Sequence, residues 1–328
     1  MTPKQRLLKV LALEKVDRPP VAVPTQNATL EVMKRAGVYW PQALREAAPM
    51  AALALACQRV YGFESVRLPF DINVEAETMG CATRYGEETD PPVSSPKDRD
   101  RLDDLVFPDP KTSGRMAQTL QAVAIAATEK DPDIPLIAAL GTPFEVISTV
   151  YNFDHLYEDL KSGKERLHGL LERTLNLLMA YGKELSGAGA DVMMVVDGTS
   201  QTLMPDQFRE FSAPYTARLI GSLGKPAILH VCGNPTRLIA DMAGTGARGL
   251  SLDSAVLAVK ARANSGGKTA LVGNLNVRAM HDGAPLEVAA MARQAAADGW
   301  DVVAPGCGIL PTTPIENIRA YVEAIKSL

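Results

Sequence analysis

Short apolar runs alternate with longer stretches of mixed apolar and polar residues along the whole chain. Eight of the runs are rich in apolar or β-branched residues and are bounded by turn-forming residues, which is typical of buried strands. They fall at Pro20–Pro24, Ser65–Pro69, Pro135–Leu140, Asp191–Val196, Pro226–Val231, Arg248–Leu252, Thr269–Val272 and Asp301–Ala304. We therefore predict eight strands, most of them separated by helices.

The stretches between these runs show the spacing of amphipathic helices. From Lys164 to Leu185, leucines recur at intervals of three and four residues, which places them on one face of a helix. A similar stripe lies between Met50 and Val60. The last helix is predicted to begin near Thr313-Pro314, because proline is favoured in the first turn, and to continue to the C-terminus.

Eight strands alternating with helices predict an α/β protein with the fold of a (β/α)8 TIM barrel and with N-terminal insertions. We expect one barrel domain over residues 1–328, with a hairpin and loop insertion around residues 71–109, in which Thr78–Gly86 forms the hairpin. A doubly wound sheet is the competing fold, but no G-x-G-x-x-G turn follows the first predicted strand.

Composition excludes several classes of protein. The chain is 46% hydrophobic and 22% charged, as in ordinary folded proteins, and its net charge of −4 gives no basic footprint for nucleic acid. No apolar stretch reaches the roughly 18 residues of a membrane span, and the N-terminus lacks a signal region. Four cysteines do not make a disulfide framework in a chain of this size, so we expect a cytoplasmic protein.

Polar residues collect directly after the predicted strands, where a TIM barrel has its active site. Asn27, Asp197 and Asn274 at this rim are candidates for contacting a cofactor. Asp71 and Asp253, which also follow strands, are candidates for catalysis.

The sharpest chemical signal is a histidine and two cysteines at strand ends. His230 and Cys232 are two residues apart, so in an extended strand they face the same side, and Cys307 follows the last strand. One imidazole and two thiolates suit zinc and leave one coordination position for a substrate. The alternative interpretation is that the cysteines pack as small hydrophobic residues and that His230 is a core histidine.

A fourth zinc ligand has three candidates. Asp253 ends the strand that follows His230 and Cys232. Glu75 and Glu77 flank Ala76 and would share one face of a short extended stretch.

The sequence resembles the uroporphyrinogen decarboxylase superfamily, and within it the methylcobamide:coenzyme M methyltransferase branch. The resemblance implies a (β/α)8 barrel in which His230, Cys232 and Cys307 bind zinc and the thiol of the acceptor completes the coordination. The methanogen enzymes have glutamate at the position of Asp253. The matching segments are Met1–Leu8, Val16–Val21, Gly62–Asp71, Val74–Gly80, His230–Asn234 and Gly306–Pro311.

The resemblance implies a zinc-dependent corrinoid methyltransferase. It would move a methyl group from a methylated corrinoid protein to an acceptor, which is the thiol of coenzyme M or alternatively tetrahydrofolate. No histidine lies in the pattern D-x-H-x-x-G that supplies a lower ligand to cobalamin, so we expect the methylcobalamin to arrive on a partner protein.

Two other functions remain open from the sequence. The first is cofactor-independent decarboxylation of the uroporphyrinogen type, because Asp71 matches the aspartate that contacts pyrrole nitrogens in that enzyme. The arginine-rich segment R-Q-A-G-R-Y is replaced here by Thr25–Thr29, however, and a substrate with many carboxylates needs such arginines. The second is a non-catalytic or zinc-sensing barrel that binds a corrinoid.

Overall fold

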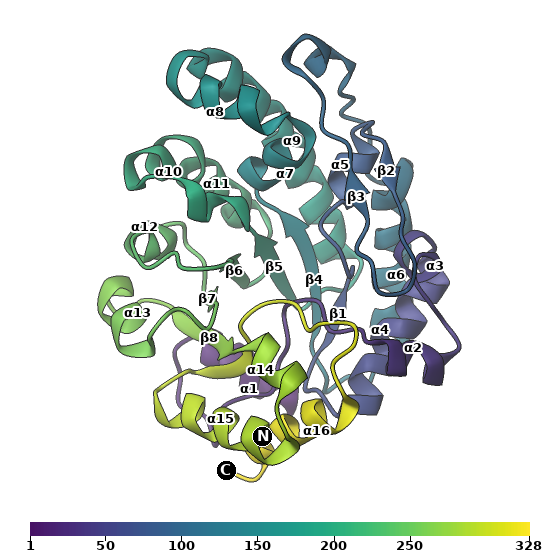
Figure 1. The fold of residues 1–328 in the computed structure, drawn as a ribbon, viewed down its shortest axis with the longest axis vertical. Coiled ribbons are helices and arrows are strands. Elements are labelled where there is room, and N and C mark those ends of the chain that lie inside the picture. The colour runs from purple at the N-terminus through teal and green to yellow at the C-terminus, as the bar shows by residue number, and fades with distance from the viewer.

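A curved sheet of seven parallel strands forms the centre of the computed structural model, which describes residues 1–328 (Figure 1). The strands lie in the order β1-β4-β5-β6-β7-β8-β9, so each strand of this sheet pairs with the strand of the sheet that follows it in the sequence. The predicted α/β barrel is confirmed, except that the first predicted strand, Pro20–Pro24, does not form. The strands are β1 (Val66–Leu68), β4 (Leu136–Gly141), β5 (Val192–Val196), β6 (Ala227–Val231), β7 (Gly249–Leu252), β8 (Ala270–Leu275) and β9 (Val302–Pro305).

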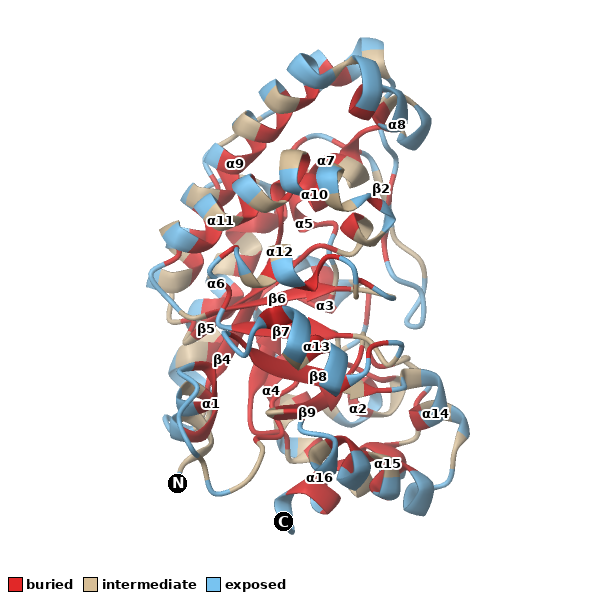
Figure 2. Ribbon diagram, turned by 90° about the vertical axis from the view of Figure 1, so that its left-hand side faces the viewer, coloured by how far each residue is buried: buried red, intermediate tan, exposed pale blue.

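Most helices lie outside the sheet, with their buried faces against the strands and their exposed faces in solvent (Figure 2). The predicted long helix is α9 (Lys164–Gly187), and the predicted last helix is α16 (Ile315–Lys326). The others are α1 (Pro3–Leu11), α2 (Leu30–Ala36), α3 (Gln42–Arg45), α4 (Ala47–Tyr61), α5 (Val74–Thr78), α6 (Gly114–Glu129), α7 (Pro143–Val150), α8 (Phe153–Ser162), α10 (Pro205–Phe211), α11 (Ala213–Ser222), α12 (Ile239–Ala243), α13 (Ala258–Ser265), α14 (Val277–Asp282) and α15 (Pro285–Ala297), with 3-10 helices η1 (Arg99–Asp104) and η2 (Thr199–Thr202).

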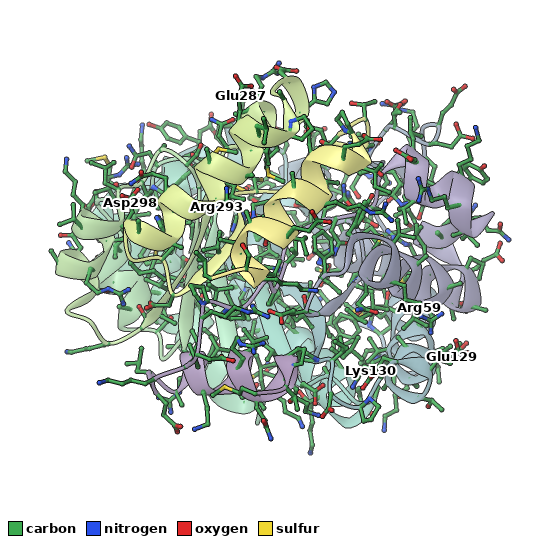
Figure 3. The ribbon with its side chains drawn as sticks, turned by 90° about the horizontal axis from the view of Figure 1, so that it is seen from below. Arg59, Glu129, Lys130, Glu287, Arg293 and Asp298 are labelled. Carbon is green, nitrogen blue, oxygen red and sulfur yellow. The ribbon has the colours of Figure 1, made fainter.

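The outer faces of the helices are charged. Figure 3 views α15, α16 and α4 from outside, with labelled charged side chains on and beside them. Arg59 lies on α4, Glu287 and Arg293 lie on α15, and all three are exposed. No helix combines the length and the apolar character that crossing a bilayer requires.

The prediction of a strand at Pro20–Pro24 is wrong, although the segment is buried beside β1. The Val21 carbonyl accepts from the Glu64 amide at 2.9 Å, but the Val21 and Val23 amides donate to the side chains of Glu64 and Ser65. Proline at both ends of the segment offers no N–H to a ladder. Side chains therefore replace the backbone ladder that a strand would form here.

The same segment joins β1 to the opposite edge of the sheet. The Thr25 hydroxyl donates to the Cys307 carbonyl at 2.9 Å, and the Ile309 amide donates to the Gln26 carbonyl at 2.8 Å. The barrel is therefore closed by an extended segment between β1 and β9, rather than by an eighth strand.

Helix α1 fills one end of the barrel. Its Leu7, Val10 and Leu11 share a buried cluster with the inward residues of the strands, which include Ile137, Met194 and Val272. A Cβ atom at Gly249 would lie 3.0 Å from the Leu11 side chain, so glycine gives α1 the room to approach β7. A much larger apolar cluster fills the space between the strands and the outer helices.

The hairpin predicted at Thr78–Gly86 has its first strand within that range but its second strand beyond it. Thr78 is the last residue of α5, and the antiparallel pair is β2 (Thr83–Arg84) with β3 (Val93–Ser94). Pro91 and Pro92 lack the N–H that a ladder needs, so pairing begins at Val93 and the connecting loop is long.

Candidate active site

The structure brings the three predicted metal ligands together at the carboxyl ends of the strands. The His230 Nε2 atom lies 3.1 Å from the Cys232 sulfur, and the two cysteine sulfurs are 3.8 Å apart. All three donor atoms lie within 4.8 Å of one another. Cys232 and Cys307 belong to neither apolar cluster, unlike the other two cysteines.

This donor set suits zinc. Two thiolates at about 2.3 Å from one ion in tetrahedral geometry are about 3.8 Å apart, which is the separation seen here. The two sulfurs are close enough to share a hydrogen bond, and the contacts of Cys307 with Cys232 and with His230 outweigh burial and lower the pKa of Cys307. The same contact between the sulfurs and burial raise the pKa of Cys232, so without a metal the pair favours one thiolate and one thiol.

Ser251 fixes the orientation of the histidine ring. It pairs with His230 across β6 and β7, and its hydroxyl lies 3.0 Å from His230 Nδ1. Because Nδ1 is engaged there, Nε2 is left facing the two cysteines. A hydrogen bond to the second ring nitrogen is the usual support of a metal-binding histidine.

We expect the change Ser251→Ala to lower zinc affinity about 10- to 100-fold, because the ring loses the partner that sets its tautomer and direction. Competition with a chromophoric chelator measures this. Ser265→Ala is the matched control, since Ser265 is also buried but bonds only to the Arg262 carbonyl on α13. Equal zinc affinity in the Ser251 and Ser265 variants would contradict the role given to Ser251.

None of the three candidates for a fourth ligand belongs to the group of donor atoms that lie within 4.8 Å of one another, although Asp253 lies near Cys232. The Asp253 carboxylate accepts from the Gly233 amide at 3.3 Å and from the Ser254 hydroxyl at 3.0 Å. Glu75 and Glu77 do not share a face of an extended stretch, because they lie in helix α5, where residues two apart point to different sides. Glu75 accepts from the Gly141 amide, and Glu77 accepts from the Tyr85 hydroxyl.

Asp71 lines the cavity but is neutralised by a buried arginine. Its Oδ1 atom accepts from Arg115 at 3.1 Å and from the Asn73 amide at 2.8 Å, and Oδ2 accepts from a second Arg115 nitrogen. Both side chains of this ion pair are 4% exposed.

Asn27, Asp197 and Asn274 are held within the protein and do not line the cavity. Asn27 is buried, and its side-chain oxygen has no hydrogen-bond partner. Asp197 accepts from the Ser212 hydroxyl at 2.7 Å, and burial raises the pKa of Asp197 to about 6. Asn274 donates to the Val256 carbonyl at 2.9 Å. Their roles as cofactor contacts stay predictions.

A cavity of about 520 Å³ lies above the cluster of donor atoms. Aromatic side chains, the strand ends and the loop between β2 and β3 surround it, so the inserted hairpin forms part of its wall. The lining residues are Thr25, Gln26, Trp40, Arg67, Phe70, Asp71, Ile72, Asn73, Thr89, Pro91, Pro92, Met194, Val196, Gly198, His230, Cys232, Cys307, Gly308, Ile309, Leu310 and Pro311.

Two further residues at this site, Glu145 and Arg67, were not predicted from the sequence. Glu145 in α7 is buried, accepts from the Thr199 amide at 2.8 Å, and has a pKa raised to about 7 by burial and by the charge of Asp197. In the sequence, Glu145 stands three residues after Thr142, a spacing that is typical of a helix N-terminus. Nothing in that pattern indicates that the carboxylate is buried with a raised pKa. The other residue is Arg67, a buried cation in the cavity wall.

Comparison with known proteins gives similarity over the full length of the chain. The family model for uroporphyrinogen decarboxylase (URO-D) matches residues 2–328. Methylcobamide:CoM methyltransferase MtbA of Methanosarcina acetivorans is 33% identical over 338 residues, which is 99% of this chain and 98% of that protein. The corresponding MtaA of Methanosarcina barkeri is 32% identical over 329 residues, covering 98% and 97%. A solved methyltransferase from Methanosarcina mazei superposes with a TM-score of 0.94 at 33% identity, covering 100% of this chain and 99% of that one.

Proposed function

The chain belongs to the uroporphyrinogen decarboxylase family, and from this premise we propose a zinc-dependent methyltransferase that moves a methyl group from a methylated corrinoid protein to the thiol of coenzyme M. The observation that carries the proposal is the cluster of His230, Cys232 and Cys307 at the base of an open cavity. Full-length similarity to methylcobamide:CoM methyltransferases supports the same reaction.

The residues of the cluster have distinct tasks in this mechanism. His230, Cys232 and Cys307 would hold zinc, which when bound supplies the acceptor thiol as a thiolate at neutral pH. Ser251 keeps the imidazole in place. The apolar walls, which include Trp40 and Phe70, exclude water from the acceptor sulfur.

The transfer itself is a displacement at carbon. The acceptor thiolate attacks the methyl carbon with an electron pair of sulfur, and the carbon–cobalt bond breaks with its electrons remaining on the corrinoid. The protein contributes by holding the sulfur where the methyl group can be brought in line with it. The corrinoid protein must approach the carboxyl ends of the strands, because the donor cluster and the cavity lie there.

The cavity gives little support for a decarboxylase of the uroporphyrinogen type. In this chain the Asp71 carboxylate forms an ion pair with Arg115, so its charge is already balanced before a substrate enters. No observation in the cavity favours a porphyrinogen with many carboxylates, since Arg67 is the only arginine or lysine that lines it.

The decisive assay uses the zinc-loaded protein with methylcobalamin, free or on a corrinoid protein. We expect loss of the methylcobalamin spectrum with coenzyme M as the acceptor, and no release of carbon dioxide from uroporphyrinogen. Homocysteine and tetrahydrofolate are the parallel acceptors. Transfer to tetrahydrofolate alone would replace the proposed acceptor, and the absence of transfer to all three would refute the proposed function.

A further inference from the structure

Arg67 is a cation in the cavity wall that forms no salt bridge, because the nearby Asp71 carboxylate, which acts on its charge, is held by Arg115. It lies in the middle of β1 opposite Ile137, a residue of the inner cluster, so its side chain belongs to the inner face of the barrel. The residue is 3% exposed and lines the cavity. Burial lowers the pKa of Arg67 to about 10, so the guanidinium is still charged at neutral pH.

The hydrogen bonds of Arg67 leave part of its guanidinium free. Nε donates to the Pro24 carbonyl at 2.9 Å, and Nη1 donates to the Pro69 carbonyl. Nη2 forms no hydrogen bond within the chain, and Arg67 takes part in no salt bridge. The one carboxylate that lines the cavity, Asp71, is bound to Arg115. A buried charge without a partner is costly, so a partner that enters with the ligand would stabilise this arrangement.

The position of Arg67 relative to the donor cluster limits the size of that ligand. Pro24 accepts from Arg67, and the next residue, Thr25, donates to the Cys307 carbonyl, with 2.9 Å for each bond. Allowing about 5 Å for the span between adjacent residues, Arg67 Nε lies at most about 11 Å from the Cys307 carbonyl oxygen. Arg67 and the donor cluster line the same cavity, so a small ligand can contact both.

We propose that Arg67 binds the anionic end of the acceptor, so that the cavity selects a short thiol carrying a sulfonate or a carboxylate. This inference rests on the proposed function, and it names the substrate class of the same site. Two guanidinium N–H groups can donate to two oxygens of such an anion, an arrangement that is stronger than bonds to a neutral group. Arg67 is a specificity-determining residue here and takes no part in bond formation.

The test compares methyl transfer from methylcobalamin to four short thiols. They are 2-mercaptoethanesulfonate, 3-mercaptopropionate, neutral 2-mercaptoethanol and cationic cysteamine. We expect Arg67→Gln to raise KM for the two anionic thiols about 10- to 100-fold and to change KM for 2-mercaptoethanol by less than about twofold. Arg67→Lys should restore part of the selectivity. The comparison of the two anionic thiols shows whether sulfonate or carboxylate is preferred.

Arg18→Gln is the matched control. Arg18 also bonds to a proline carbonyl, that of Pro19, and it pairs with Glu64, but it does not line the cavity. Its loss should lower stability without changing the selectivity among thiols. If Arg67→Gln raises KM equally for charged and neutral thiols, as a purely structural arginine would, the inference is wrong.

A second measurement does not depend on turnover of the anionic thiol. Ethanesulfonate, which lacks the thiol, should bind the wild-type protein in a calorimetric titration and should compete with 2-mercaptoethanol, whereas ethanol should do neither. Absence of ethanesulfonate binding overturns the inference even if methyl transfer is observed. If wild type binds ethanesulfonate and Arg67→Gln does not, the anion site is supported even when no methyl transfer is observed. The inference about Arg67 and the proposed methyltransferase function can therefore be refuted independently of each other.

Discussion

Replacing Cys307 with alanine is expected to remove bound zinc and to reduce methyl transfer by more than the roughly 10- to 100-fold that loss of an outer-shell partner costs. His230 and Cys232 alone leave two protein ligands, too few for a stable zinc site. The fold should persist, because Cys307 lies just after β9, is partly exposed, and belongs to neither apolar cluster. Metal analysis and circular dichroism of the purified variant measure both effects.

Cys57→Ala provides the comparison that separates metal binding from packing. Cys57 is fully buried in α4 within the large apolar cluster, where burial raises the pKa of its thiol well above the usual value. We expect this variant to lose some stability but to keep its zinc and its activity. Equal zinc content in wild type and in Cys307→Ala would contradict the metal assignment.

Glu64→Ala is expected to lower the free energy of unfolding by about 3–5 kcal/mol, because it removes the carboxylate that pairs with Arg18 and one of the two that pair with the buried Arg6. The Glu64 side chain is 4% exposed and accepts from Arg6 at 2.8 Å and from Arg18 at 2.7 Å. It also accepts from the Val21 amide, which is one of the bonds that hold the closing segment Pro20–Pro24 against β1. Chemical denaturation measures the loss.

Asp17→Ala is the matched control, since Asp17 also bonds to Arg6 but has a side chain that is 46% exposed. Its effect should be clearly smaller. A Glu64 variant as stable as the Asp17 variant would show that the buried network adds little to barrel closure.

The contribution of Glu64 should also depend on pH. Burial alone would raise the pKa of Glu64, but hydrogen bonds from Arg18 and the Val21 amide, with the charges of both arginines, hold it below the usual value. A carboxyl whose pKa is lower in the folded state stabilises the protein above its unfolded pKa of about 4.3. That stability is lost as the pH falls from there through the folded pKa, so wild type and Glu64→Ala should converge in acid.

Most strand positions and the proximity of His230, Cys232 and Cys307 could be predicted because each depends on a local rule. Buried parallel strands read as short apolar runs, and residues after such strands meet at one end of the barrel. His230, Cys232 and Cys307 carry donor atoms in this position, so their proximity follows from the fold class. The order of the strands in a barrel is enough to predict that Cys307 lies near His230 and Cys232.

The remaining features depend on contacts that have no periodic signature. Pro20–Pro24 has the composition of a strand, but its amides bond to Glu64 and Ser65, which lie more than 40 positions away. Glu145 has the position of a helix-start residue, and only the fold shows that its carboxylate turns towards Thr199. Arg67 lies in a strand whose other residues are apolar, and only the folded barrel shows that its side chain lines the cavity.

The closing segment has a consequence for how the protein is made. Thr25 bonds to Cys307, and the Leu30 amide bonds to the Pro311 carbonyl, so two regions near opposite ends of the chain meet at the cavity. Early elements such as α4 and β1 leave the ribosome long before Cys307 does. A nascent chain therefore has no complete donor cluster until Cys307 has been translated, so any metal that this cluster binds is captured late in synthesis.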